Sequence, residues 1–241
     1  MRFYPLFMDL AGRSCLVVGA GAVAARKARS LLDCGARVTV VGVKPAAPCR
    51  ALERRGAVLR DRRFRASDVS RQALVIAATD DPAVNAAVAA AARSKRIPVN
   101  VVDDPARCSF IVPAVVSRGD LTVAISTGGK SPAAARLVKA RIEELLGEEY
   151  AALVRLLGAH RARMKETVAQ QSTRARAWKQ MLDDGAGVGV GAGVEVLEAL
   201  RRGDRKSATA TVRRCLDAAA ALGNERGVAE ASPLPRTRTR R

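Results

Sequence analysis

The residues best suited to chemistry in this chain are the small ones within 14–28, which read SCLVVGAGAVAARKA. Four apolar residues precede a Gly-Ala-Gly turn and a helical apolar pattern follows it, so the stretch predicts a strand, a tight turn and a helix. Gly19 allows the turn, Gly21 leaves room for a pyrophosphate, and Ala24 keeps the helix close to the strand. The amides that open the helix would face that anion. We interpret the stretch as a dinucleotide site, with a glycine turn of an ordinary α/β domain as the alternative.

A carboxylate follows a predicted strand in the first half of the chain. Ligands of a doubly wound sheet gather beyond the carboxyl ends of its strands, and Asp103 closes the apolar strand expected at 97–102. A carboxylate buried there, beside the expected nicotinamide, would suit proton transfer. We therefore expect Asp103 to do acid/base work, with a turn role as its alternative, and we interpret Asp104 as the turn residue before Pro105.

Small and polar residues fall beyond the same strand ends in clusters at 19–23, 42–44 and 79–81, with Asn100 beside Asp103. The second strand of such a sheet normally ends in Asp or Glu, which binds the ribose hydroxyls. Here it continues as Gly-Val-Lys. Because Lys44 would attract a 2′-phosphate, the residues alone leave NAD and NADP open.

Alternating strands and helices must position these clusters. The apolar runs predict strands at 15–18, 37–41, 56–59, 73–77 and 97–102. A helix should follow Gly21, and another should begin at Pro82 with Asp81 as its cap. Strands that alternate with helices predict an α/β fold with a Rossmann-like, doubly wound parallel sheet.

The pattern changes near Cys108. Two strands, expected at 109–116 and 121–126, are separated by only four residues and predict a hairpin, which does not belong to a βαβ repeat. Ser131 should cap a helix that starts at Pro132. Helical periodicity then runs through 148–183, which is followed by a glycine-rich stretch. The second half is therefore expected to be a small α+β region followed by a helical C-terminal region.

The composition limits the function classes. A net charge of +19 and a pI near 11.1 would suit a nucleic acid, an anionic membrane surface or a polyanionic small molecule, unless they reflect arginine usage alone. An aromatic content of 3% supplies few stacking platforms, so nucleic acid is not the expected partner. No apolar run reaches the roughly 20 residues of a membrane span. The single histidine, His160, excludes His-rich metal cages, so no permanent metal site is expected.

The cysteines are dispersed, at Cys15, Cys34, Cys49, Cys108 and Cys215. An odd and scattered set is typical of reduced thiols rather than of a disulfide framework or a zinc site. The first residues lack a long apolar signal core and a small-residue cleavage site. We therefore expect a cytoplasmic protein.

Three spaced stretches together carry a resemblance to a known family. They are the glycine turn with its flanks, then AATDDPAVN, then NVVDDPARCSFIVPAVVSRGDLTVAISTGGKSPAAARLVK. In this order they resemble the precorrin-2 dehydrogenase/sirohydrochlorin ferrochelatase module of siroheme synthase, over roughly residues 4–178. The resemblance implies NAD-dependent oxidation of precorrin-2 to sirohydrochlorin and, in many members, insertion of Fe²⁺ to give siroheme. No methyltransferase domain follows, so we expect the stand-alone form.

The resemblance also implies roles for particular residues. Asp103 takes the position of the carboxylate implicated in both activities and would contact Fe²⁺ only transiently, and Thr127 takes the position of a family serine. The expected contacts of the cofactor, NAD, are Gly19, Gly21, Ala22, Val23, Gly42, Val43, Lys44, Thr79 and Asp80. The expected contacts of the tetrapyrrole substrate are Asn100, Arg107, Ser109, Thr127 and Lys130, with Arg136 and Lys139 as further anchors.

The resemblance implies a homodimer as well, built on the hairpin and helical segments. The expected organisation is a Rossmann domain at 1–107, a hairpin/helix dimerisation region at 108–146, a helical domain at 147–184, a glycine-rich linker at 185–193, a helical pair at 194–222 and a disordered basic tail at 223–241. Three other functions stay open on the residues: an unrelated NAD(P) oxidoreductase, a nucleotide-sensing regulatory module like those that gate potassium transport, and a nucleic-acid binder that acts through the basic tail.

Overall fold

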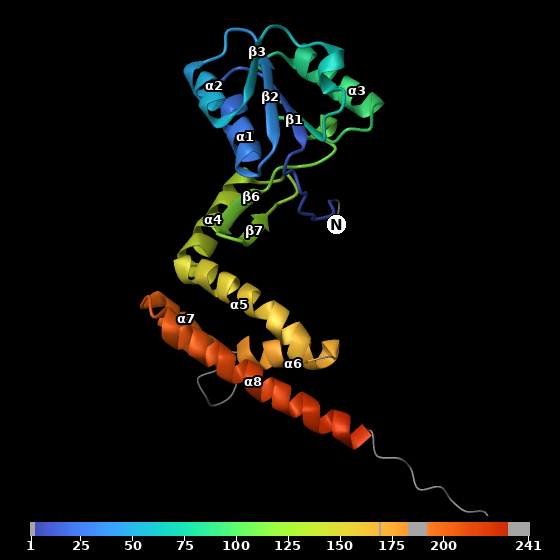
Figure 1. Ribbon diagram of the computed structural model, residues 1–241. Helices are drawn as coiled ribbons and strands as arrows, with labels where there is room; N and C mark the ends of the chain where they lie inside the picture. The colour runs from blue at the N-terminus through green and yellow to red at the C-terminus, as the bar shows by residue number, and fades with distance from the viewer. Residues whose placement is uncertain (1–2, 169, 183–191, 231–241) are drawn as a thin grey trace, which may run out of the picture. The chain divides into compact units, whose positions relative to one another are not determined.

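The structure is a computed structural model, and it describes residues 3–168, 170–182 and 192–230. The chain forms two compact units. One comprises the chain up to Pro113 together with Ser126–Ala134, and the other comprises Ala114–Ile125 and the chain from Ala135 onwards. Each unit has its own helices and strands (Figure 1), and buried apolar residues cluster within each unit.

The first unit contains a five-stranded parallel sheet with the order β3-β2-β1-β4-β5. Its strands are β1 (Ser14–Val18), β2 (Arg37–Gly42), β3 (Val58–Asp61), β4 (Leu74–Ala77) and β5 (Val99–Val101). All four strand pairings are parallel. The predicted doubly wound sheet is therefore confirmed.

Alternate residues of the strands enter two separate apolar clusters. Cys15 and Val17 of β1 belong to the cluster that includes the buried residues of α1 (Ala22–Asp33) and α2 (Ala47–Arg50), whereas Leu16 and Val18 belong to the cluster that includes those of α3 (Pro82–Ser94). Figure 1 shows the same division, with α1 and α2 on one side of the sheet and α3 on the other. Because both faces are covered, β1 and β4 read as continuous apolar runs.

Short 3₁₀ turns and caps connect these elements. The turns are η1 (Ala51–Arg55), η2 (Ala66–Val69) and η3 (Pro105–Arg107). The Asp81 carboxylate accepts hydrogen bonds from the backbone N–H groups of Ala83 and Val84 at 2.8 and 3.3 Å. Asp81 is therefore the predicted N-cap of α3, with Pro82 as the first helical residue.

The second unit begins with an antiparallel hairpin of β6 (Ala114–Arg118) and β7 (Leu121–Ile125). The hairpin was predicted, but its first strand starts at Ala114 rather than at residue 109. Residues 109 and 110 instead bond to β5, because Ser109 donates its N–H to the Val99 carbonyl at 2.8 Å and the Phe110 carbonyl accepts a hydrogen bond from the Asn100 amide at 3.1 Å. Pro113, which has no N–H, then separates the two segments.

Five helices follow in the described part of the chain: α4 (Pro132–Leu145), α5 (Glu148–Thr167), α6 (Gln171–Leu182), α7 (Ala192–Arg201) and α8 (Arg205–Glu230). The Ser131 hydroxyl accepts the Ala134 N–H at 3.1 Å, as expected of the cap of α4. The helical run predicted at 148–183 is wrong in one respect, since it breaks after Thr167. Val168 is extended and buried, and its carbonyl accepts a hydrogen bond from Arg174 at 2.6 Å.

Two other expected boundaries differ from the structure. Ala192 and Gly193, expected in the linker, open α7, and the rest of the predicted linker lies outside the described residues. Helix α8 continues to Glu230, so the first eight residues of the predicted disordered tail are helical, while 231–241 lie outside the described residues. The first proline after α8 begins is Pro233, so no proline interrupts the helix before that point.

One buried carboxylate anchors the turn that leads into β4. Asp68 has a side chain only 5% exposed and accepts two hydrogen bonds from the Arg62 guanidinium at 2.6 and 2.8 Å. It also accepts the Arg65 N–H at 2.9 Å. These contacts, above all those with Arg62, hold the pKa of the Asp68 carboxyl below its ordinary value of 3.8.

We predict that Asp68→Ala lowers the free energy of unfolding by about 2 kcal/mol at pH 7, because the substitution removes charged hydrogen bonds from a buried site. A pKa lowered in the folded state gives stability that is present above the unfolded value of 3.8 and is lost as the pH falls through the folded value. Urea unfolding at pH 7 and at pH 2 should therefore show the difference from wild type shrinking in acid. Asp33→Ala, which breaks an exposed ion pair with Arg55, is the matched control, and a difference that is equal at both pH values would contradict the assignment.

Candidate active site at the carboxyl edge of the sheet

The strand order places a ligand crevice between β1 and β4. The chain runs from β1 outward to β2 and β3, and then returns to the other side of β1 to form β4 and β5. The loops that follow β1 and β4 therefore diverge at the carboxyl edge, which is where ligands of this kind of sheet bind. Residues 19–21 of the first predicted cluster lie in the loop after β1, and Ala22 and Val23 open α1; the predicted cluster at 79–81 lies in the loop after β4.

Gly19 joins three strand ends in a space that admits no side chain. Its N–H donates to the Val41 carbonyl at 2.9 Å, and its φ of +134° is a conformation that other residues rarely adopt. A Cβ at this position would lie 2.1 Å from the carbonyl oxygen of Ala78. The first glycine of the turn is therefore required by the packing of the protein itself.

Gly21 has the opposite surroundings. It is the N-cap residue of α1, it makes no side-chain cap hydrogen bond, and the first turn carries no acidic residue. A Cβ on Gly21 would meet no protein atom within 4 Å. The start of α1, where Ala22 and Val23 are exposed, thus presents open backbone amides and suits an anion such as the pyrophosphate of a dinucleotide.

The segment after β2 packs against the glycine turn. A Cβ on Gly42 would lie 2.7 Å from the Ala20 Cβ, and the Ala46 N–H donates to the Ala20 carbonyl at 2.9 Å. The buried Cys49 thiol donates to the Gly21 carbonyl at 3.4 Å, and burial raises the pKa of this thiol, which favours the protonated form that can donate. Val43 and Lys44, two of the predicted cofactor contacts, are exposed beside this turn.

Thr79 organises the loop after β4. Its N–H and hydroxyl both donate to Asn85 Oδ1, at 3.3 and 2.8 Å, and the Asn85 amide donates back to the Thr79 carbonyl at 2.9 Å. Asp80 is exposed beyond it. The structure thus brings Thr79 and Asp80 to the predicted edge, with the Thr79 side chain bonded within the loop; contact of either residue with the cofactor stays a prediction.

Asp103 follows β5 at the same edge and has a left-handed backbone, with φ +59°. Its side chain is exposed, so the burial expected from the sequence is wrong: the chain turns outward directly after Val101 and Val102. Asp104 has the turn role predicted for it, because it accepts the Arg107 N–H at 3.2 Å and forms an ion pair with the Arg107 guanidinium. Arg107 also holds the pKa of the Asp104 carboxyl below its usual range. Of the two carboxylates, Asp103 is therefore the one available to a ligand.

Lys27 lies close enough to Asp103 to interact with its charge, and the sequence analysis did not single it out. It lies half-buried on α1, and its ammonium group interacts electrostatically with the Asp103 carboxylate and with Cys108. The pKa of the Lys27 ammonium group is lowered, mainly by burial, and the negative charge of Asp103 partly offsets this effect. The sequence feature that could have pointed to Lys27 is its position in the helical pattern, between the apolar residues Ala24 and Ala28, which are buried in the structure.

Two predicted substrate contacts hold the segment that follows Asp103. The buried Asn100 amide donates to the Phe110 carbonyl at 3.1 Å, and the Ser109 hydroxyl accepts the Val99 N–H at 2.8 Å. Arg107 is engaged by Asp104, as described above. All three side chains therefore shape the loop that bears Asp103, and direct contact of any of them with a substrate stays a prediction.

The remaining predicted contacts lie in the loop between β7 and α4. The Thr127 hydroxyl accepts the Ser131 N–H at 3.1 Å and donates to the Ser131 carbonyl at the same distance, which closes the loop around Gly128 and Gly129. Both glycines have positive φ. Lys130, at the tip, is exposed. The Thr127 hydroxyl is thus occupied in shaping this loop.

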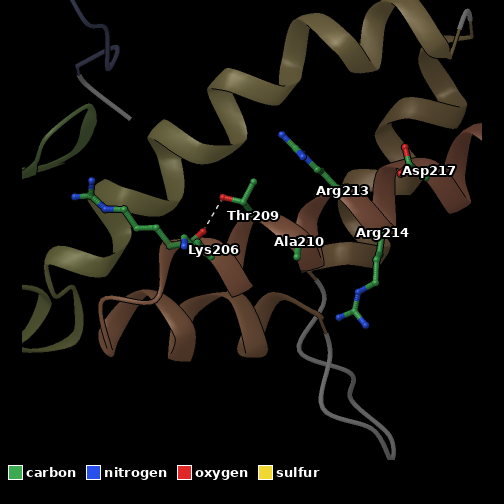
Figure 2. Close-up of a pocket in the computed structure, with 7 residues that line it drawn as sticks. Lys206, Thr209, Ala210, Arg213, Arg214 and Asp217 are labelled. Atoms are coloured by element: carbon green, nitrogen blue, oxygen red, sulfur yellow. Dashed lines mark hydrogen bonds between the residues drawn. The ribbon is translucent and has the colours of Figure 1, made fainter.

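A hollow of about 570 Å³ lies along α8, far along the chain from these residues. Its lining residues are Arg205, Lys206, Thr209, Ala210, Arg213, Arg214 and Asp217. Figure 2 shows the Arg213 and Arg214 side chains leaving α8 in opposite directions, and Arg214 and Asp217 have ion-pair partners in Glu195 and Arg163. Because its charged groups do not converge, we assign no binding site to the hollow.

Three further findings concern metals, membranes and thiols. Among the described residues, no group of three His, Cys, Asp or Glu side chains is placed to hold a metal ion. None of the described helices is long and apolar enough to cross a bilayer. All five cysteines are unpaired.

The strand order, the glycine turn and the open start of α1 define an NAD(P)-binding Rossmann domain. In agreement, an NAD(P)-binding family model matches residues 6–114, and the model of the sirohaem biosynthesis protein central region matches residues 118–145. The chain belongs to the family of siroheme synthases and precorrin-2 dehydrogenases.

The siroheme synthase of Methylococcus capsulatus is 45% identical over 184 residues, and that of Pseudomonas paraeruginosa is 46% identical over 182 residues. These matches cover 76% and 75% of this chain but only 39% of each relative, so the chain spans about two fifths of their length. The solved structure of SirC, a precorrin-2 dehydrogenase, superposes with a TM-score of 0.64 at 26% identity, covering 83% of this chain and 100% of SirC.

The two glycines of the turn give a matched pair of substitutions. We predict that Gly19→Ala destabilises the fold by more than about 3 kcal/mol, because its Cβ collides with the backbone of Ala78. Gly21→Ala should unfold at nearly the wild-type temperature and yet bind NADH weakly, because its methyl group takes space that only the ligand needs. Thermal unfolding together with NADH fluorescence separates the two, and wild-type NADH affinity in a folded Gly21→Ala variant would refute the placement of the pyrophosphate.

Proposed function

We propose that this chain oxidises precorrin-2 to sirohydrochlorin with NAD⁺ as the oxidant. One observation carries the proposal: a ligand-accessible carboxylate, Asp103, stands at the same sheet edge as the glycine turn and the open start of α1. The resemblance to SirC supports the substrate, since the chain covers that precorrin-2 dehydrogenase over its whole length.

The reaction removes a hydride and a proton from neighbouring atoms of the macrocycle. Bound NAD⁺ supplies the hydride acceptor, and the residues around Gly19, Gly21 and Gly42 would hold it. Asp103 is the base that takes the proton, and its exposure allows it to pass that proton on to water. One carboxylate and one dinucleotide are sufficient for this chemistry.

The substrate carries eight carboxylates, so the site must offset its negative charge. Among the described residues, neither Lys27 nor Lys130 has an ion-pair partner within 4.0 Å, and both belong to the unit that bears Asp103. We therefore propose these two as anchors for the substrate. Arg136 and Lys139 are not chosen, because both belong to the other unit and Lys139 already pairs with Glu143 at 3.5 Å.

We predict that Asp103→Ala and Asp103→Asn each lower kcat for precorrin-2 oxidation by about 100-fold or more, because both remove the base. NADH affinity should stay at the wild-type level, since the glycine turn and α1 are untouched. The measurement is NAD⁺-dependent absorbance change under anaerobic conditions, together with NADH fluorescence. Asp120→Asn, in the exposed turn of the hairpin, is the matched control.

Wild-type turnover by both Asp103 variants would remove Asp103 from the mechanism. No turnover of precorrin-2 by the wild-type chain would overturn the substrate assignment instead, while leaving the nucleotide site untouched. Insertion of Fe²⁺ stays a further prediction, with iron as a substrate and Asp103 as its transient contact. Action in the cytoplasm also stays a prediction, which the unpaired cysteines support.

We also propose that two copies of the chain associate through α4 and the hairpin. Leu137, Val138 and Leu145 are 64, 43 and 71% exposed and recur seven and eight residues apart, which places them on one face of α4. Val115 of the hairpin is 41% exposed. An apolar stripe of this kind is typical of a surface that a second subunit covers.

The double substitution Leu137→Glu with Leu145→Glu tests the proposed dimer. It should raise the dissociation constant by about 100-fold or more, because each leucine contributes apolar burial to the interface and each glutamate would bury a charge. Sedimentation velocity measures the change. The helical content should remain at the wild-type level, because both side chains are exposed within one chain, and a dimer of undiminished affinity would contradict the proposed surface.

A further inference from the structure

Strand β2 does not end in the acidic residue that normally binds the ribose of a dinucleotide. The neighbouring strand β3, however, ends in an aspartate that pairs with the last residue of β2. In the parallel ladder between β2 and β3, Gly42 pairs with Asp61, and each is the last residue of its strand. Neighbouring strands lie about 4.8 Å apart. Asp61 is therefore one strand spacing from the position where a ribose-binding carboxylate is normally found.

A hydrogen bond directs the Asp61 side chain toward the loop after β2. Its Oδ1 atom accepts the Lys44 N–H at 2.8 Å. Lys44 has a left-handed backbone with φ +53°, a strained conformation for a residue that is not glycine, and this bond helps to hold it. The Asp61 carboxylate consequently faces the carboxyl edge, next to the predicted cofactor contacts Val43 and Lys44.

The charge of Asp61 is not neutralised by its neighbours. The flanking Arg60 and Arg62 instead approach Asp68, at 3.8 and 2.6 Å. Among the described residues, Asp61 has no ion-pair partner within 4.0 Å, and its side chain is exposed. With Oδ1 committed to the Lys44 N–H, the second oxygen is left to accept a hydrogen bond from a ligand.

We propose that Asp61 is the specificity-determining residue that selects NAD over NADP. Its carboxylate accepts a hydroxyl of the adenosine ribose, and its negative charge repels the 2′-phosphate that NADP carries in place of that hydroxyl. The exposed Lys44 ammonium would attract the 2′-phosphate of NADP. It sits on a long flexible side chain, however, whereas the Asp61 carboxylate is fixed by its hydrogen bond to the backbone. This inference rests on the NAD(P)-binding site described above and not on the identity of the tetrapyrrole.

Direct binding of NADH and NADPH, followed by nucleotide fluorescence, tests the assignment without the oxidation reaction. Asp61→Asn keeps an oxygen that can accept the Lys44 N–H and removes only the charge. We expect this substitution to raise the affinity for NADPH relative to NADH by about tenfold. Lys44→Met in the same background should then lower NADPH affinity. Asp33→Asn, which removes an exposed carboxylate at the other end of α1, should leave the ratio unchanged.

Each outcome decides a separate point. An unchanged NADPH-to-NADH ratio in a folded Asp61→Asn variant would overturn the role of Asp61. Asp61→Ser, which is smaller and also offers an acceptor, repeats the test if the amide variant does not fold, and it should relax the preference in the same direction. If wild type binds neither nucleotide, the cofactor site itself is wrong, and if both bind while precorrin-2 is not oxidised, only the proposed reaction fails.

Discussion

The close approach of the backbone at Gly19 to the end of β4 is the constraint on which the rest of the site depends. Because the turn after β1 lies against the Ala78 carbonyl and bonds to Val41, the ends of three central strands meet at one level. That level determines where α1 begins and where its amides point. Ala46 and Cys49 then bond to the backbone of the same turn, so the cofactor loop is held from the side of α2 as well.

The two units carry different parts of the proposed work. The first unit holds the nucleotide edge, Asp103, Lys27 and the loop that Thr127 closes. The second unit holds a separate apolar core among α5–α8 and presents the exposed stripe of α4. The proposed catalytic chemistry and the proposed subunit association therefore have distinct structural supports, which makes their variants separable by experiment.

Much of this arrangement could be predicted from the sequence, because strong local signals marked it. Apolar runs of four residues, the glycine turn and the Asp81-Pro82 cap each specify an element by themselves. The exposure of Asp103 could not be predicted in this way, since it depends on where the chain leaves β5. Asp61 and Lys27 were missed for a related reason: each meets its partners only after strands or helices distant in sequence become neighbours. The break at Val168 shows the same limit, because helical periodicity continues across a residue that the tertiary structure buries in extended form.

The segment that bears Asp103 starts and finishes on a single strand. It leaves β5 after Val101 and returns to hydrogen-bond Val99 through Ser109. The β5 edge of the sheet is therefore covered by the same segment that presents the Asp103 carboxylate. A margin closed in this way offers no free strand to a neighbouring molecule. Loosening the segment that bears Asp103 would therefore expose the backbone groups of β5 to pairing with another chain, so the residues that present this carboxylate also protect one edge of the sheet.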